Sequence, residues 1–129
     1  MIYLDSSVVV AHLLKEKRRP SIAFWDQQMA SSRLLEYEVW RRAHARGVGT
    51  SHADVVRELL DQMAYVELTL TVLERARGPF PAGIRTLDAL HLASASFLRA
   101  TDHTLRLATY DKRMLAAAKK LEIPAFEPD

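Results

Sequence analysis

The segment Thr86-Leu87-Asp88-Ala89-Leu90-His91-Leu92-Ala93-Ser94-Ala95-Ser96-Phe97-Leu98-Arg99-Ala100 is the most informative part of the sequence. It follows a stretch rich in glycine and proline, 78–83, which cannot continue a helix and is predicted to be a loop. Apolar and small residues then recur at helical spacing, which predicts a buried helix over 86–100. Asp88 falls in the first turn, where free N–H groups and the helix dipole favour a carboxylate. Taken alone, Asp88 would only stabilise its helix, so the positions of the other acids matter.

The composition is that of a soluble globular chain. Its 129 residues suffice for one domain over 1–129 with its own hydrophobic core. The 18 basic and 16 acidic residues allow nucleic-acid binding without arguing for it. No segment approaches the roughly 18 apolar residues of a membrane span, and the N-terminus does not resemble a secretory signal. The absence of cysteine excludes disulfides and thiolate metal sites and is compatible with the cytoplasm.

Strand and helix patterns alternate along the chain. Strands are predicted over 1–4, 30–34, 65–68 and 105–109, with a possible edge strand over 123–126. Helices are predicted over 8–14, 20–29, 35–46 and 51–63, the last opened by a capping box of Ser51 and Asp54. A short helix is predicted to follow a cap at Thr69 or Thr71 and to end at about 76. Two further helices are predicted over 86–100 and 112–121. Strands separated by helices imply right-handed crossovers. The predicted fold class is therefore α/β, with three α/β/α layers around a mostly parallel sheet of four to five strands.

Two acids follow predicted strands directly. Asp5 ends the first strand and Asp111 ends the fourth, so both are expected at the carboxyl edge of a parallel sheet, where ligands bind in such folds. Glu38 and Asp88 lie in early turns of helices that begin near this edge. Simpler interpretations remain open, because Asp5 can cap a helix and Glu38 can pair with Arg42 four residues on.

Four carboxylates at one edge would repel one another unless a cation neutralised them. With only oxygen donors in the set, Mg²⁺ or Mn²⁺ is favoured over zinc. The pattern therefore predicts a divalent-metal site at this edge.

The chain resembles the PIN-domain family, and within it the VapC-type toxins of toxin–antitoxin pairs. The resemblance covers essentially the whole chain, and its most specific part is Leu87-Asp88-Ala89-Leu90-His91-Leu92-Ala93. The other matching segments are Ile2-Tyr3-Leu4-Asp5-Ser6-Ser7, Ser32 to Arg42, and Leu107-Ala108-Thr109-Tyr110-Asp111-Lys112-Arg113. The resemblance implies a Mg²⁺-dependent endoribonuclease that can use Mn²⁺ and cleaves particular cellular RNAs.

The resemblance also implies the residues of the site. Asp5, Glu38, Asp88 and Asp111 would form the catalytic acidic set, with Asp5 and Asp88 as direct metal ligands and Asp111 supporting the same ion or a second one. Glu38 would act directly or through water, and Glu36 is the alternative if the helix register differs. Ser6 and Thr109 would line the pocket behind the ligands. Basic residues near the site could attract the RNA backbone: Arg41, Arg42, Arg46, Lys112 and Arg113. His91 is expected to be a hydrogen-bonded core or interface histidine.

The resemblance implies RNA as the substrate and a small VapB-like antitoxin as a partner, whose cationic side chain would enter the acidic groove. It also implies a homodimer, formed through helices that carry Phe24, Trp25 and Trp40. Two other functions remain open. One is a PIN fold that only binds RNA or protein. The other is a phospho-signalling receiver domain, which fits poorly because Thr69 stands where such a domain needs an aspartate.

Overall fold

The protein is a three-layer α/β/α domain around a parallel sheet, seen in a computed structural model that describes residues 1–81 and 83–129. The sheet has four strands in the order β3-β2-β1-β4, and each neighbouring pair is parallel. The strands are β1 (Ile2–Leu4), β2 (Met29–Ser32), β3 (Ala64–Val66) and β4 (Arg106–Ala108). The predicted fold class is confirmed, with four strands in the sheet.

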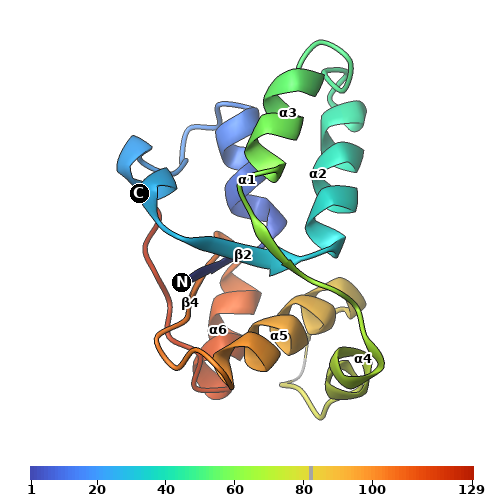
Figure 1. The fold of residues 1–129 in the computed structure, drawn as a ribbon, viewed down its shortest axis with the longest axis vertical. Coiled ribbons are helices and arrows are strands. Elements are labelled where there is room, and N and C mark those ends of the chain that lie inside the picture. Colours follow the sequence, from blue (N-terminus) through green and yellow to red (C-terminus); the bar gives the residue numbers. More distant parts are fainter. Residues whose placement is uncertain (82) are drawn as a thin grey trace.

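The helices cover both faces of the sheet (Figure 1). One face carries α1 (Ser6–Leu13), α2 (Leu34–Ala45) and α3 (Ala53–Leu60), and the other carries α4 (Leu70–Ala76), α5 (Thr86–Arg99) and α6 (Lys112–Lys120). α2 ends before Gly47, whose φ of 74° is a left-handed conformation that suits glycine. The predicted helix over 86–100 is confirmed as α5.

Strand β1 lies inside the sheet and separates two hydrophobic cores. Ile2 and Leu4 point into the core beneath α1, α2 and α3, whereas Tyr3 points into the core beneath α5 and α6. This alternation follows from the two-residue period of a strand, and every residue of β1 is buried. The chain winds outward from β1 to β2 and β3 and then returns to place β4 on the other side of β1. The carboxyl ends of β1 and β4 therefore form the topological switch point, where ligands bind in open α/β sheets.

Three local predictions were wrong. The helix predicted over 20–29 is a short 3-10 helix, Ile22–Asp26, because buried Met29 already belongs to β2 and pairs with Ile2. The edge strand predicted over 123–126 is reduced to a single bridge between Leu107 and Ala125. The capping box at the start of α3 is not formed, since His52 is the N-cap residue and makes no side-chain cap bond.

Other boundaries shift by a few residues. The second predicted strand ends at Ser32 rather than Leu34, because the Ser32 hydroxyl accepts a hydrogen bond from the Leu34 N–H, where α2 begins. Thr69 caps α4 as predicted, accepting a bond from the Val72 N–H at 3.4 Å. The predicted loop over 78–83 follows α4, except that Ala82 lies outside the described residues. Over the part of the chain that the structure describes, no helix is long and apolar enough to cross a membrane.

Candidate functional site

Asp5 is a buried carboxylate fixed by hydroxyl groups. It stands directly after β1, is 5% exposed and is the N-cap residue of α1. Its Oδ1 accepts bonds from the Ser7 backbone N–H at 3.2 Å and the Ser7 hydroxyl at 2.6 Å. Its Oδ2 accepts a bond from the Thr109 hydroxyl at 2.7 Å. Both oxygens are thus held, which orients the carboxylate at the switch point.

Thr109 connects Asp5 to Asp111. Because Leu4 pairs with Ala108 across β1 and β4, the next residue of each strand, Asp5 and Thr109, also lie side by side. The Thr109 hydroxyl accepts a bond from the Asp111 backbone N–H at 3.0 Å, while Oδ1 of Asp111 caps α6. Thr109, at the carboxyl end of β4, therefore links the Asp5 carboxylate to the backbone of Asp111.

The environment of Asp5 is unfavourable for a bare negative charge. Burial raises the pKa of its carboxyl above the usual value, hydrogen bonds from Ser7 and Thr109 lower it, and the nearby charge of Glu38 raises it. Without a bound cation, burial prevails and the pKa is raised. A buried carboxylate whose charge is disfavoured is a suitable partner for a cation.

Glu38 and Glu36 lie two residues apart on α2 but have different surroundings. Oε1 of Glu38 accepts a hydrogen bond from Nε2 of His91 at 2.5 Å, and the Glu38 side chain is only 14% exposed. Glu36 instead forms a surface ion pair with Arg33. Glu38 is therefore the acid that faces α5, and its hydrogen-bond partner is His91; the alternative ion pair with Arg42 is not formed within the described part of the chain.

Asp88 lies in the first turn of α5, as predicted, but it is only loosely held. Its Oδ2 is buried and has no hydrogen-bond partner within the described residues. The closest cationic group is the Nε of Arg85, 3.9 Å away, which is too far for a hydrogen bond. A buried carboxylate oxygen without a partner is costly and calls for a ligand.

The four acids suit a hard cation in their chemistry. All of them offer oxygen donors, the type that Mg²⁺ and Mn²⁺ prefer. The unpartnered Oδ2 of Asp88 and the disfavoured charge of Asp5 are both features that a cation would relieve. Among residues 1–81 and 83–129, however, no three His, Cys, Asp or Glu side chains form a group that could hold a metal ion.

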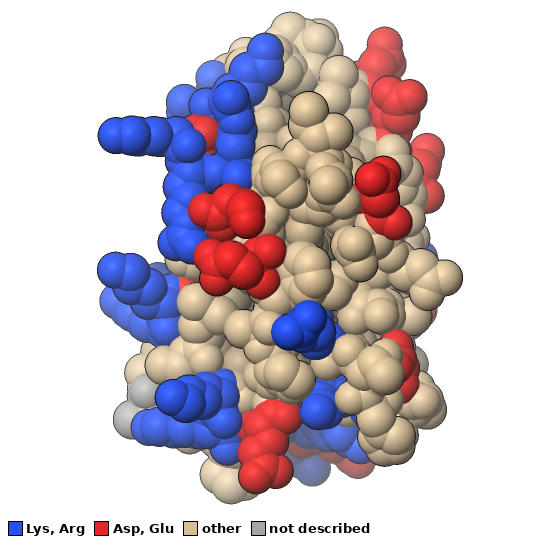
Figure 2. All heavy atoms as spheres, turned by 90° about the vertical axis from the view of Figure 1, so that its left-hand side faces the viewer, with Lys and Arg blue, Asp and Glu red and all other residues tan. Residues whose placement is uncertain are grey.

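The basic residues near this edge are exposed. Exposed basic side chains follow Glu38 on α2 and open α6, namely Arg41, Arg42, Arg46, Lys112 and Arg113. Arg42 lines a small pocket with Ser7, Arg18 and Tyr110, immediately beside the hydroxyl that binds Asp5. On the opposite side of the molecule, where β2 begins, Lys and Arg gather along one margin and several acids along the other (Figure 2). Among the predicted basic residues, Arg42 thus shares a pocket with Ser7, one of the partners of Asp5.

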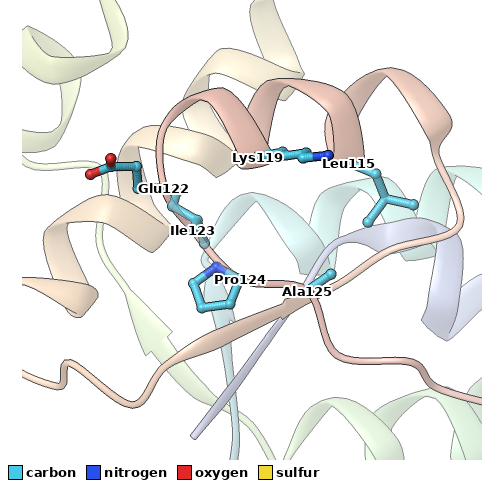
Figure 3. Close-up of a pocket in the computed structure, with 6 residues that line it drawn as sticks. All are labelled: Leu115, Lys119, Glu122, Ile123, Pro124 and Ala125. Atoms are coloured by element: carbon cyan, nitrogen blue, oxygen red, sulfur yellow. The ribbon is translucent and has the colours of Figure 1, made fainter.

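Another pocket contains none of the predicted site residues. It lies between α6 and the segment that follows it and is lined by Leu115, Lys119, Glu122, Ile123, Pro124 and Ala125 (Figure 3). The Glu122 carboxylate points away from the other lining side chains (Figure 3). This pocket therefore has the character of an apolar surface hollow rather than that of an acidic site.

Two residues of the site were not anticipated from the sequence. Ser7, not Ser6, donates to Asp5, and its hydroxyl also accepts a bond from the Tyr110 backbone N–H at 2.9 Å. The sequence contained a signal for this, because an N-cap carboxylate accepts hydrogen bonds from the backbone N–H groups two or three residues later in the chain. Tyr3, which binds His91, carried no such signal, since it appears only as one apolar residue of a strand.

Comparisons with known proteins agree with this geometry. The PIN domain family matches residues 2–120. Ribonuclease VapC46 of Mycobacterium tuberculosis is 35% identical over 130 residues, which cover 98% of this chain and 97% of that protein. Ribonuclease VapC47 of the same species is 29% identical over 135 residues, which cover 99% of this chain and 97% of that protein.

A solved structure has the same fold. It is a toxin–antitoxin complex from Klebsiella pneumoniae, with a TM-score of 0.66, 21% identity and coverage of 90% of this chain and 91% of that one. The family match and the relatives extend over nearly the whole chain. The chain belongs to the PIN-domain family and, within it, to the VapC-type ribonucleases.

Proposed function

We propose that this protein is a divalent-metal-dependent endoribonuclease and the toxin of a toxin–antitoxin pair, using Mg²⁺ with Mn²⁺ as a substitute. The observation that carries the proposal is the buried Asp5 carboxylate, fixed by Ser7 and Thr109 at the switch point of the sheet. The relatives named as VapC ribonucleases support RNA as the substrate.

Each acid has a separate role in this proposal. Asp5 and Asp88 would hold the cation directly, and Asp111 would support the same ion or a second one. Glu38 would act on the ion directly or through water. A bound divalent cation supplies activation of water and neutralisation of the charge that builds on the scissile phosphate. Ser7 and Thr109 keep the Asp5 carboxylate oriented for this role.

RNA must approach an edge that is lined with acids. The cation neutralises part of that charge, and exposed arginine and lysine side chains attract the phosphate backbone. We assign this role to Arg41, Arg42, Lys112 and Arg113, of which Arg42 lines a pocket together with Ser7. Loss of one such contact would weaken binding by a modest factor and leave the chemistry intact.

The proposed partner is a VapB-like antitoxin in the cytoplasm. An arginine or lysine from the antitoxin, placed among the four carboxylates, would compete with the cation and block the site. A homodimer is also expected, but Phe24 is 3% exposed and belongs to the core, and Trp25 and Trp40 pack against the same core. These aromatic residues therefore offer less free surface to a second copy than the sequence suggests.

The test is cleavage of a total RNA pool by purified, antitoxin-free protein with Mg²⁺ or with EDTA. We expect discrete fragments only in the presence of metal, and their ends would identify the target. Glu38→Gln should lower cleavage by about tenfold or more. Glu36→Gln is the matched control on the same helix and should cleave like the wild type, because Glu36 forms only a surface ion pair.

Two results would contradict the proposal. Cleavage that persists in EDTA would show that the activity does not depend on a divalent metal. No cleavage by folded protein, together with no binding of Mn²⁺, would favour a PIN fold that only binds RNA or protein. The receiver-like alternative is already weakened, because the sheet order β3-β2-β1-β4 differs from the order 2-1-3-4-5 of the flavodoxin-like folds to which receivers belong.

A further inference from the structure

We infer that His91 and Tyr3 are positioning residues that hold the Glu38 carboxylate in place, an inference that rests on the proposed function of Glu38. A continuous set of hydrogen bonds leads from the backbone of β2 through Tyr3 and His91 to Glu38. It joins four elements, β2, β1, α5 and α2, and so spans the sheet and both helical layers. We call this set, formed by Ser32 N–H, Tyr3, His91 and Glu38, the relay.

The relay is buried over most of its length. Tyr3 is fully buried and His91 is 1% exposed. The Tyr3 hydroxyl oxygen lies 3.1 Å from the Ser32 nitrogen and 2.8 Å from Nδ1 of His91. The two rings also meet edge to face, with their centroids 5.8 Å apart. Only Glu38, at the end of the relay, lies partly at the surface.

We assign one direction of donation along the relay. The Ser32 N–H can only donate to the Tyr3 oxygen, so the Tyr3 O–H is available to donate to Nδ1 of His91. Nε2 then carries the ring proton and donates it to Oε1 of Glu38, because a carboxylate can only accept. With Tyr3 as the donor to Nδ1, the ring proton of His91 lies on Nε2.

The consequence for the site is that the Glu38 side chain is held in one orientation. Glu38 has three rotatable side-chain bonds, and a free glutamate at 14% exposure would sample several rotamers. The bond from His91 engages one oxygen, Oε1, and leaves Oε2 for the site. His91 belongs to the same helix as Asp88, one turn on, so α5 supplies both an acid and the group that orients a second acid.

The experiment compares variants that remove one link of the relay at a time. Tyr3→Phe removes only the hydroxyl, while His91→Gln keeps an amide donor near the Nε2 position and His91→Asn is too short to reach Glu38. We expect Tyr3→Phe and His91→Asn to lower kcat for RNA by about 10- to 100-fold, with KM nearly unchanged. His91→Gln should recover part of the loss.

Two measurements separate positioning from a general loss of stability. Tyr65→Phe is the matched control, because it likewise removes one hydrogen-bonded tyrosine hydroxyl. The Tyr65 hydroxyl donates to the backbone carbonyl of Leu60 and takes no part in the relay. This variant should lower the free energy of unfolding and leave kcat unchanged. In the metal-free protein, ¹H–¹⁵N spectra of the imidazoles should show His91 as the Nε2–H tautomer in the wild type and as a tautomer mixture in Tyr3→Phe.

Several results would overturn the inference. One is a folded Tyr3→Phe variant with wild-type kcat and an unchanged His91 tautomer. If Tyr3→Phe does not fold, equal kcat values for His91→Gln and His91→Asn would have the same meaning. A wild-type His91 with its proton on Nδ1 would also contradict the relay. If the wild type cleaves no RNA, the proposed function fails, and the imidazole spectrum still decides whether the relay exists.

Discussion

Asp5 and Asp88 are both acids of the proposed site, but their surroundings differ. Both oxygens of Asp5 are occupied by hydrogen bonds from Ser7 and Thr109. Oδ2 of Asp88 is buried without a partner, with Arg85 no closer than 3.9 Å. Asp5 is therefore held in place by neighbouring hydroxyl groups, whereas Oδ2 of Asp88 has no hydrogen-bond partner within the described residues. In the proposed site, one metal ligand would be oriented by the fold and the other would be satisfied by the cation.

The largest expected effect is the loss of activity when either acid is neutralised. Asp5→Asn and Asp88→Asn should each lower the cleavage rate of a synthetic RNA by about a hundredfold or more, because metal-assisted chemistry is worth several kcal/mol. Asp54→Asn is the matched control, since Asp54 is also a first-turn acid but is fully exposed. It should cleave at the wild-type rate. Wild-type activity in either of the first two variants would remove that acid from the site.

Removing the support of each acid should have unequal effects on stability. Thr109→Val deletes the donor to Asp5 and leaves the Asp111 N–H without its acceptor, so it should cost about 1–3 kcal/mol in the free energy of unfolding. Arg85→Gln removes only a long, exposed ion pair to Asp88 and should cost less than about 1 kcal/mol. Urea denaturation would measure both changes. Equal costs would show that the two acids are held alike.

The stability of the metal-free protein should depend on pH through Asp5. Because burial raises the pKa of Asp5 in the folded state, the folded protein binds this proton more tightly than the unfolded chain. The contribution of Asp5 to stability is therefore present at low pH and is lost as the pH rises from the unfolded value of about 4 through the raised folded value. Unfolding in EDTA across this range should show the loss in the wild type and not in Asp5→Asn. Identical pH dependence in both proteins would contradict this assignment.

Local sequence patterns were sufficient for the fold and for the element on which each acid lies. Asp5 and Asp111 follow strands, and a parallel sheet must bring the ends of neighbouring strands together, so their places after β1 and β4 follow from the element order. The helical spacing after Thr86 placed Asp88 in a first turn. These inferences needed only the periodicity of strands and helices and the crossover rule.

Contacts between distant segments could not be predicted in the same way. The choice between Glu38 and Glu36 depends on which one meets His91, a contact between α2 and α5 across 53 residues. The Glu38–Arg42 pair, which the helical spacing favours, is replaced by this non-local bond. The prediction of a helix over 20–29 was wrong for a similar reason, because Met29 pairs with Ile2 and so belongs to strand β2.

Direct binding of Mn²⁺ to purified, metal-free protein tests the central claim, that the acids of this edge hold a divalent cation. Calorimetric titration of the wild type and of Asp54→Asn should show the same affinity for Mn²⁺. Asp88→Asn should bind Mn²⁺ much more weakly, because it removes one of the two proposed direct ligands, the one whose buried Oδ2 has no hydrogen-bond partner within the described residues. Equal Mn²⁺ affinity in Asp88→Asn and the wild type would contradict the account.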